Sequence, residues 1–191
     1  MKVRKGEAGY IRKKKTRELI KVILEFGIVI ALFVTGYITT KTRLNLLTLV
    51  AVLGCLPASK AMVGYIMLVP RKSLEEETVR EIEQAGTHLT KAYDMVLTSY
   101  EHVMPIDSIV ITGNTVCGFT KSEKVDLSYV ESYIKKTLAN QYFEKVSVKI
   151  FREYAPYLAR VKAMEELAVS SNAQAEKQEE GIKHTILTLS M

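Results

Sequence analysis

The sequence predicts an α+β protein in which a two-helix transmembrane hairpin precedes a small domain of mixed helices and strands. Two apolar runs near the N-terminus, residues 19–40 and 44–69, flank a short polar break at residues 41–43. A helix needs about 20 apolar residues to cross the roughly 30 Å hydrocarbon core of a bilayer, and both runs are long enough. The rest of the chain, residues 73–191, shows helical and strand patterns in the order αβββαβαβ.

Positive charge is concentrated at the start of the chain. Residues 1–70 contain 12 Lys and Arg against 3 Asp and Glu, a net charge of +9, whereas residues 71–191 carry a net charge of −3. Residues 1–18 form a basic segment, which we expect to contact anionic lipid head groups. A nucleic-acid-binding protein would more often carry its positive patch on the folded domain, so nucleic acid is not the expected partner.

The distribution of Lys and Arg also predicts the sidedness of the hairpin. Eight basic residues precede the first helix, two lie in the turn, and Arg71 and Lys72 follow the second helix. Because basic residues near helix ends favour the cytoplasm, we expect both termini and the domain of residues 73–191 to face it. The first run ends in a poor signal-peptidase site, so we expect this helix to be retained after synthesis. The sequence therefore predicts a two-pass protein of the cell membrane.

The first helix of the domain is predicted over residues 74–90. Ser73 is expected to cap it, with Glu76 completing a capping box, and the acidic first turn suits the helix dipole. A strand is predicted over residues 93–103, where apolar and polar residues alternate, and Pro105 is expected to break it.

A β-hairpin is predicted next. Residues 106–112 and 115–120 are rich in β-prone residues, and Gly113-Asn114 between them fits a two-residue turn that needs positive φ. Asp126 is expected to cap the helix that follows. The remaining predicted elements are a helix over residues 127–138, a strand over 146–151, a helix over 156–168 and a last strand over 182–189.

Two charged residues lie inside the apolar runs. Glu25 lies 17 residues before Thr42 and Lys60 lies 18 residues after it, so an antiparallel hairpin brings both to nearly the same depth, roughly 25 Å from the turn. Since a partner reduces the cost of a charge in the hydrocarbon core, we expect an ion pair between Glu25 and Lys60. Alternatively, Lys21 pairs with Glu25 along one helix face, or each side chain extends to the interface separately.

Few residue patterns on which catalysis depends occur in the chain. The three histidines are isolated, and Cys and His show no metal-ligand spacing. No glycine-rich phosphate loop precedes a helix. However, the order helix, strand, strand, strand, helix, strand over residues 74–151 resembles the core of restriction-endonuclease-like nucleases.

That resemblance implies a metal-binding Asp at the start of the second core strand and an (Asp/Glu)-x-Lys sequence on the third. Asp107, which follows Pro105 and Ile106, matches the first element with one residue inserted. Lys121 ends the third predicted strand, but Phe119 stands where the second carboxylate belongs. Such chemistry uses carboxylates to hold Mg²⁺ and activate water, so Asp107 and Lys121 are the only catalytic candidates that the resemblance supplies.

Three functions are consistent with the sequence. The first is a non-enzymatic membrane protein whose α+β domain is tethered at the cytoplasmic face and binds a protein partner, with no cofactor or metal expected. The second is a membrane-anchored nuclease-like hydrolase. The third is a subunit of an oligomeric membrane complex, since small residues in the helices would permit self-association. The first is favoured because helix and strand patterns account for the domain, and its sequence shows no set of residues arranged for catalysis.

Overall fold

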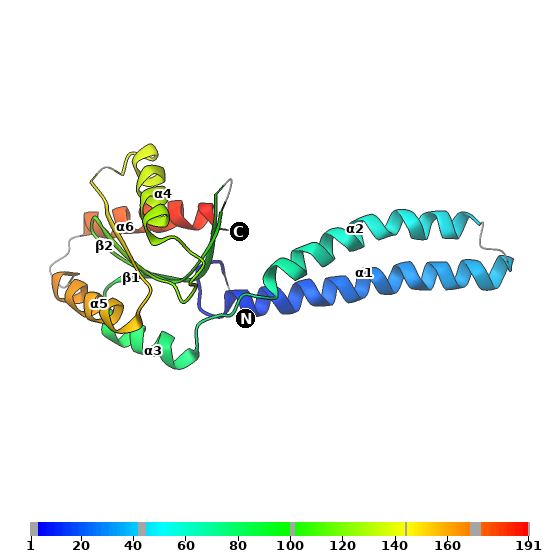
Figure 1. The fold of residues 1–191 in the computed structure, drawn as a ribbon, viewed down its shortest axis with the longest axis horizontal. Coiled ribbons are helices and arrows are strands. Elements are labelled where there is room, and N and C mark those ends of the chain that lie inside the picture. Colours follow the sequence, from blue (N-terminus) through cyan, green and yellow to red (C-terminus); the bar gives the residue numbers. More distant parts are fainter. Residues whose placement is uncertain (1–3, 42–44, 100–101, 144, 169–172, 191) are drawn as a thin grey trace. The chain divides into compact units, whose positions relative to one another are not determined.

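The computed structural model describes residues 4–41, 45–99, 102–143, 145–168 and 173–190. They form two compact units: the hairpin, residues 11–72, and the sheet domain, which combines residues 1–10 with residues 73–191. The elements in chain order are α1 (Tyr10–Thr40), α2 (Leu46–Leu68), α3 (Glu76–Ala85), β1 (Thr90–Thr98), β2 (Val103–Thr112), β3 (Thr115–Phe119), α4 (Leu127–Asn140), β4 (Ser147–Phe151), α5 (Tyr154–Ala168) and α6 (Ala173–Leu189) (Figure 1).

The two helices of the hairpin, α1 and α2, run antiparallel and in contact. Near their open ends the Lys15 ammonium donates a hydrogen bond to the Val69 carbonyl at 2.9 Å. Midway along the helices, a Cβ placed on Gly54 would lie 3.1 Å from Val29 Cγ2, so the Val29 side chain of α1 packs against this glycine of α2. The chain therefore enters and leaves the hairpin at the same end.

Both hairpin helices are long and apolar enough to cross a membrane, and only 6 % and 11 % of their most apolar windows are buried. Asn45 caps α2 by accepting a hydrogen bond from the Thr48 backbone N–H at 2.8 Å. Helix α1 begins at Tyr10, so the basic stretch and the apolar stretch are one continuous helix. The predicted turn residues Thr42 and Arg43 lie outside the described residues.

The sheet domain is built on one four-stranded sheet with the order β1-β2-β3-β4. Strands β1, β2 and β3 form an antiparallel meander, and β4 returns parallel to β3 after α4. Helices α4 and α6 cover one face, and α3 and α5 cover the other (Figure 1). Each face carries its own hydrophobic cluster, so the domain has three layers.

The first residues of the chain belong to the sheet domain rather than to a free tail. The Gly6 carbonyl accepts a hydrogen bond from the Tyr93 backbone N–H of β1 at 2.8 Å. Gly6 has φ +89°, and a Cβ there would lie 2.9 Å from Leu187 Cδ2 of α6. Glycine therefore fits this contact without strain or clash. The Lys5 ammonium also donates to the Ser190 carbonyl, so this segment contacts β1 and the C-terminal end.

Several predicted elements are confirmed. The order of elements from α3 to β4 is as predicted, and Gly113 adopts φ +51° in the β2–β3 turn, where Thr112 pairs with Thr115. Asp126 caps α4 by accepting hydrogen bonds from the backbone N–H groups of residues 128 and 129. Helix α4 buries Val130, Ile134 and Leu138.

Three predictions about the sheet domain are wrong. Residues 182–189 are helical in α6, not a last strand, and only Ser190 makes an isolated bridge to β1. The N-cap of α3 is Glu75, not Ser73. Pro105 lies within β2 instead of breaking a strand. It is tolerated because β3 pairs with β2 only from Ser108 onward, so its missing N–H can face the unpaired side.

Candidate functional site

Asp107 lies in the middle of β2, not at the start of a strand as the resemblance implied. Its Oδ2 accepts a hydrogen bond from the backbone N–H of Lys121, two residues after β3, at 2.6 Å. The structure thus brings the two candidates of the sequence together. The contact uses the backbone of Lys121, whose side chain is exposed.

A second carboxylate, Asp94 of β1, lies opposite Asp107. The pairs on either side are Tyr93 with Ser108 and Met95 with Ile106, which leaves the two aspartates facing each other across the strands. Asp94 has φ +52°, a left-handed conformation that interrupts the ladder at this point. Sequence reasoning missed Asp94, although it is the one charged residue in the apolar run from residue 92 to residue 97.

In both β1 and β2, the alternation of side chains between the two faces of the sheet is interrupted at this point. Ala92 and Met95 are three residues apart on β1, yet both belong to the cluster under α4 and α6, and Ile106 and Ile109 do the same on β2. Side chains of a regular strand share a face only at even spacing, so each strand has shifted by one residue between them. Because both strands shift together, their pairing register is unchanged on the two sides.

The pair of aspartates is poorly solvated. Asp94 is only 4 % exposed, its Oδ1 accepts a hydrogen bond from the Leu74 N–H at 3.3 Å, and its Oδ2 is buried without a partner among the described residues. Burial raises the pKa of Asp107, the hydrogen bond and charge of Lys121 lower it, and the charge of Asp94 raises it further. A buried oxygen without a partner and a strained backbone mark this point as a candidate site.

Replacing Asp107 by Asn tests this electrostatic description. A raised native pKa means that the folded state holds the proton more tightly, which stabilises the fold below the unfolded value of 3.8 and is lost as pH rises through the native value. We therefore expect the stability of Asp107→Asn relative to wild type to increase from pH 4 to pH 7. The measurement is urea unfolding of the full chain in detergent, and parallel curves for the two proteins would contradict the description.

Two carboxylates at one point of a sheet can contribute to a cation site. Among the described residues, no group of three or more His, Cys, Asp or Glu side chains could hold a metal ion. Carboxylate oxygens are ligands that Mg²⁺ takes in proteins, so Asp94 and Asp107 carry donor atoms of the right kind.

Glu25 lies on α1 and Lys60 lies on α2, so the predicted pair would join the two helices of the hairpin. Ala58 is fully buried, and Lys60, two residues further, lies about 200° around α2 and is exposed. Glu25 is half-buried, and its Oε2 has no hydrogen-bond partner in the described part of the chain. Lys21 pairs with Glu18 at 2.9 Å. Pairing of Glu25 with Lys60 stays a prediction.

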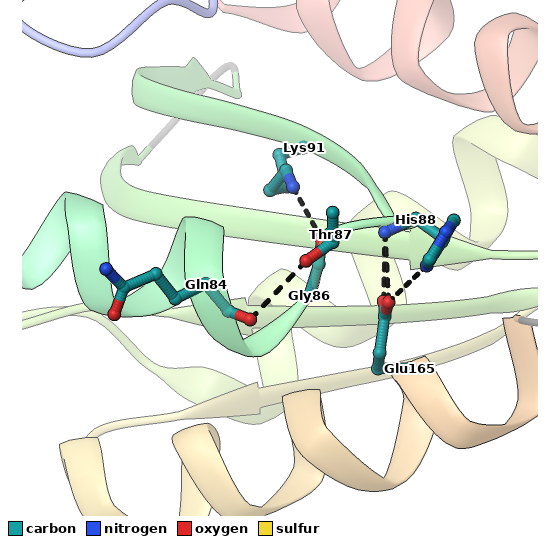
Figure 2. A network of polar contacts seen from close by, with 6 residues as sticks. All are labelled: Gln84, Gly86, Thr87, His88, Lys91 and Glu165. Atoms are coloured by element: carbon teal, nitrogen blue, oxygen red, sulfur yellow. Dashed lines mark hydrogen bonds and ion pairs between the residues drawn. The ribbon is translucent and has the colours of Figure 1, made fainter.

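A polar network joins the α3–β1 turn to α5 (Figure 2). The Glu165 carboxylate lies 2.5 Å from His88 Nδ1 and accepts a hydrogen bond from the His88 backbone N–H at 3.1 Å. The Lys91 ammonium donates to the Gly86 carbonyl at 2.5 Å, and burial lowers the pKa of Lys91. These contacts fix the start of β1 against α5, and they explain His88 as a structural residue.

No protein-family model, curated protein or solved structure matches the chain. The likeness to restriction-endonuclease-like nucleases therefore rests on the order of elements from α3 to β4 and on Asp107. Element order recurs in unrelated folds, so it carries no activity by itself.

Proposed function

We propose that this chain is a two-pass membrane protein whose hairpin holds the sheet domain at the cytoplasmic face, where the domain binds a protein partner. The observation that carries the proposal is the insertion of the hairpin between two segments of one folded domain. Residues 1–10 and 73–191 form a single unit, and residues 11–72 interrupt it.

This insertion ties the sheet domain to the membrane at two points. The chain leaves the domain after Tyr10 and returns at Ser73, so the two connections have no long linker. A domain tethered in this way stays within a short distance of the bilayer, which raises its effective concentration toward other membrane proteins. Exposed apolar helices support the anchoring, because apolar surface of this extent is otherwise costly in water.

Protease accessibility of a C-terminal epitope tag tests the sidedness. In a bacterial host, the tag on the full chain should resist protease in intact spheroplasts and be digested in inverted membrane vesicles. The eight basic residues before the first apolar run are the reason for this expectation. Digestion in spheroplasts with protection in inverted vesicles would contradict it.

Photo-crosslinking in membranes tests the interaction role. A crosslinking amino acid at Val103, which is 46 % exposed on β2, should attach the full chain to one defined protein. The matched control carries Ile134→Asp as well, because Ile134 is fully buried and a carboxylate there should unfold the sheet domain without touching the hairpin. An adduct that persists in the control would show that the crosslink does not depend on the folded sheet domain, which would contradict the interaction role.

A membrane-anchored hydrolase is the second candidate, and Asp94 favours it. The resemblance supplied one carboxylate, and the structure places a second directly opposite Asp107. A cation held there would activate water for attack on a phosphodiester. Full-length protein in detergent should then cleave DNA with Mg²⁺, and Asp107→Asn should abolish cleavage whereas Asp126→Asn, at the cap of α4, should not. Absence of Mg²⁺-dependent cleavage would remove this candidate.

A further inference from the structure

One face of the first three turns of α1 forms a groove lined by cations. The groove has a volume of about 600 Å³. Its lining residues recur every four positions along α1, so they share one face of the helix. Among the described residues no acidic side chain lines it, and one of its cations, Lys21, pairs with Glu18 at 2.9 Å. The lining residues are Arg12, Lys13, Thr16, Arg17, Ile20 and Lys21.

This face points away from α2. The residues of α1 that contact α2 include Val29 and Gly36, whose positions on the helix lie roughly opposite the groove at 100° per residue. Lys14 and Lys15 lie on the α2 side, where the Lys15 ammonium bonds to Val69. Helix α2 therefore does not cover the groove.

Toward the C-terminal end of α1, the same face becomes apolar. Ile20, Leu24 and Ile28 follow one another at four-residue spacing and are 58 %, 58 % and 52 % exposed. Lys21 lies 19 residues before Thr40, which is about 28 Å of helix and close to the thickness of a hydrocarbon core. When α1 spans a bilayer, the cations therefore lie at head-group level and the apolar stripe lies at acyl-chain level.

We infer that this face of α1 binds one anionic phospholipid, with its phosphate among the cations and an acyl chain along the apolar stripe. Cations above and apolar residues below match the two ends of a phospholipid, whereas a nucleic acid would match only the cations. The inference rests on the proposed function, because the groove meets head groups only when the hairpin is in a membrane.

Native mass spectrometry of the full-length protein in detergent measures the binding. The probes are synthetic phosphatidylglycerol and phosphatidylcholine of identical acyl chains, supplied in equal amounts. The site variant is Lys13→Gln with Arg17→Gln, and the control is Lys14→Gln with Lys72→Gln, which removes the same charge at the same end of the hairpin. We expect wild type to prefer phosphatidylglycerol, with affinity falling roughly fivefold per charge removed in the site variant and less than about twofold in the control.

Three outcomes would overturn the inference. Equal losses in the two variants would mean diffuse attraction to charge, and equal binding of the two lipids would mean that no anionic site exists. Displacement of the lipid by a short DNA duplex, with the same dependence on Lys13 and Arg17, would assign the groove to nucleic acid. Flotation with neutral phosphatidylcholine vesicles distinguishes failure of the lipid site from failure of the proposed function. If the chain floats but does not prefer phosphatidylglycerol, only the lipid site is contradicted. If the chain does not float, both the lipid site and the membrane-anchored function are contradicted.

Discussion

Membrane retention of the full chain is expected to collapse when Ile30 and Leu56 are both replaced by arginine. Each residue lies ten positions from the turn end of its helix, about 15 Å along the axis, at the centre of a bilayer. Their side chains are 59 % and 70 % exposed, so neither substitution disturbs packing between α1 and α2. An arginine at the centre of a spanning helix costs roughly 2.5–3.5 kcal/mol, and two should cost about twice that.

Flotation of carbonate-washed membranes through a density gradient measures this effect. Wild type should float almost completely, and most of the double variant should stay in the dense fractions. The matched control places arginine at Val103 and Leu167, which are 46 % and 66 % exposed on the sheet domain. It should float like wild type, because these residues face water. Equal flotation of the double variant and wild type would show that the hairpin does not enter the hydrocarbon core.

The hairpin could be predicted from the sequence because its signal is local composition. A run of about 20 apolar residues is informative without knowledge of any other part of the chain. The β2–β3 turn and the cap of α4 were predictable for the same reason, since Gly113 and Asp126 act on residues close to them in sequence. The membership of residues 1–10 in the sheet domain was not, because it depends on a hydrogen bond between Gly6 and Tyr93.

The candidate site was only half predictable. Asp107 could be selected because the resemblance to restriction-endonuclease-like nucleases implies a metal-binding Asp near this position. Asp94 could not, because its place depends on strand register and on a positive φ that tertiary structure imposes. Lys121 approaches Asp107 through its backbone, so its side-chain chemistry gave no indication of the contact.

Helix α6 was also not predictable from local sequence. Alanine substitutions of its buried residues should cause a large loss of folding stability. Ile182 and Ile186 are 0 % and 1 % exposed and belong to the cluster under α4 and α6. A helix brings these two residues onto one face and turns His184 and Thr188 away, as observed. A strand would place all four on one face, so the burial of the two isoleucines and the exposure of His184 and Thr188 agree with the helix and not with the predicted strand.

Each of Ile182→Ala and Ile186→Ala is therefore expected to lower the free energy of unfolding by about 2–5 kcal/mol, through lost burial and the cavity left behind. His184→Ala and Thr188→Ala should change it by no more than about 0.5 kcal/mol, because both side chains are exposed. Urea unfolding in detergent can be followed by tyrosine fluorescence, since seven of the ten tyrosines lie between residues 73 and 191. A cost for His184→Ala as large as that for either isoleucine would restore the strand and remove α6 from the fold.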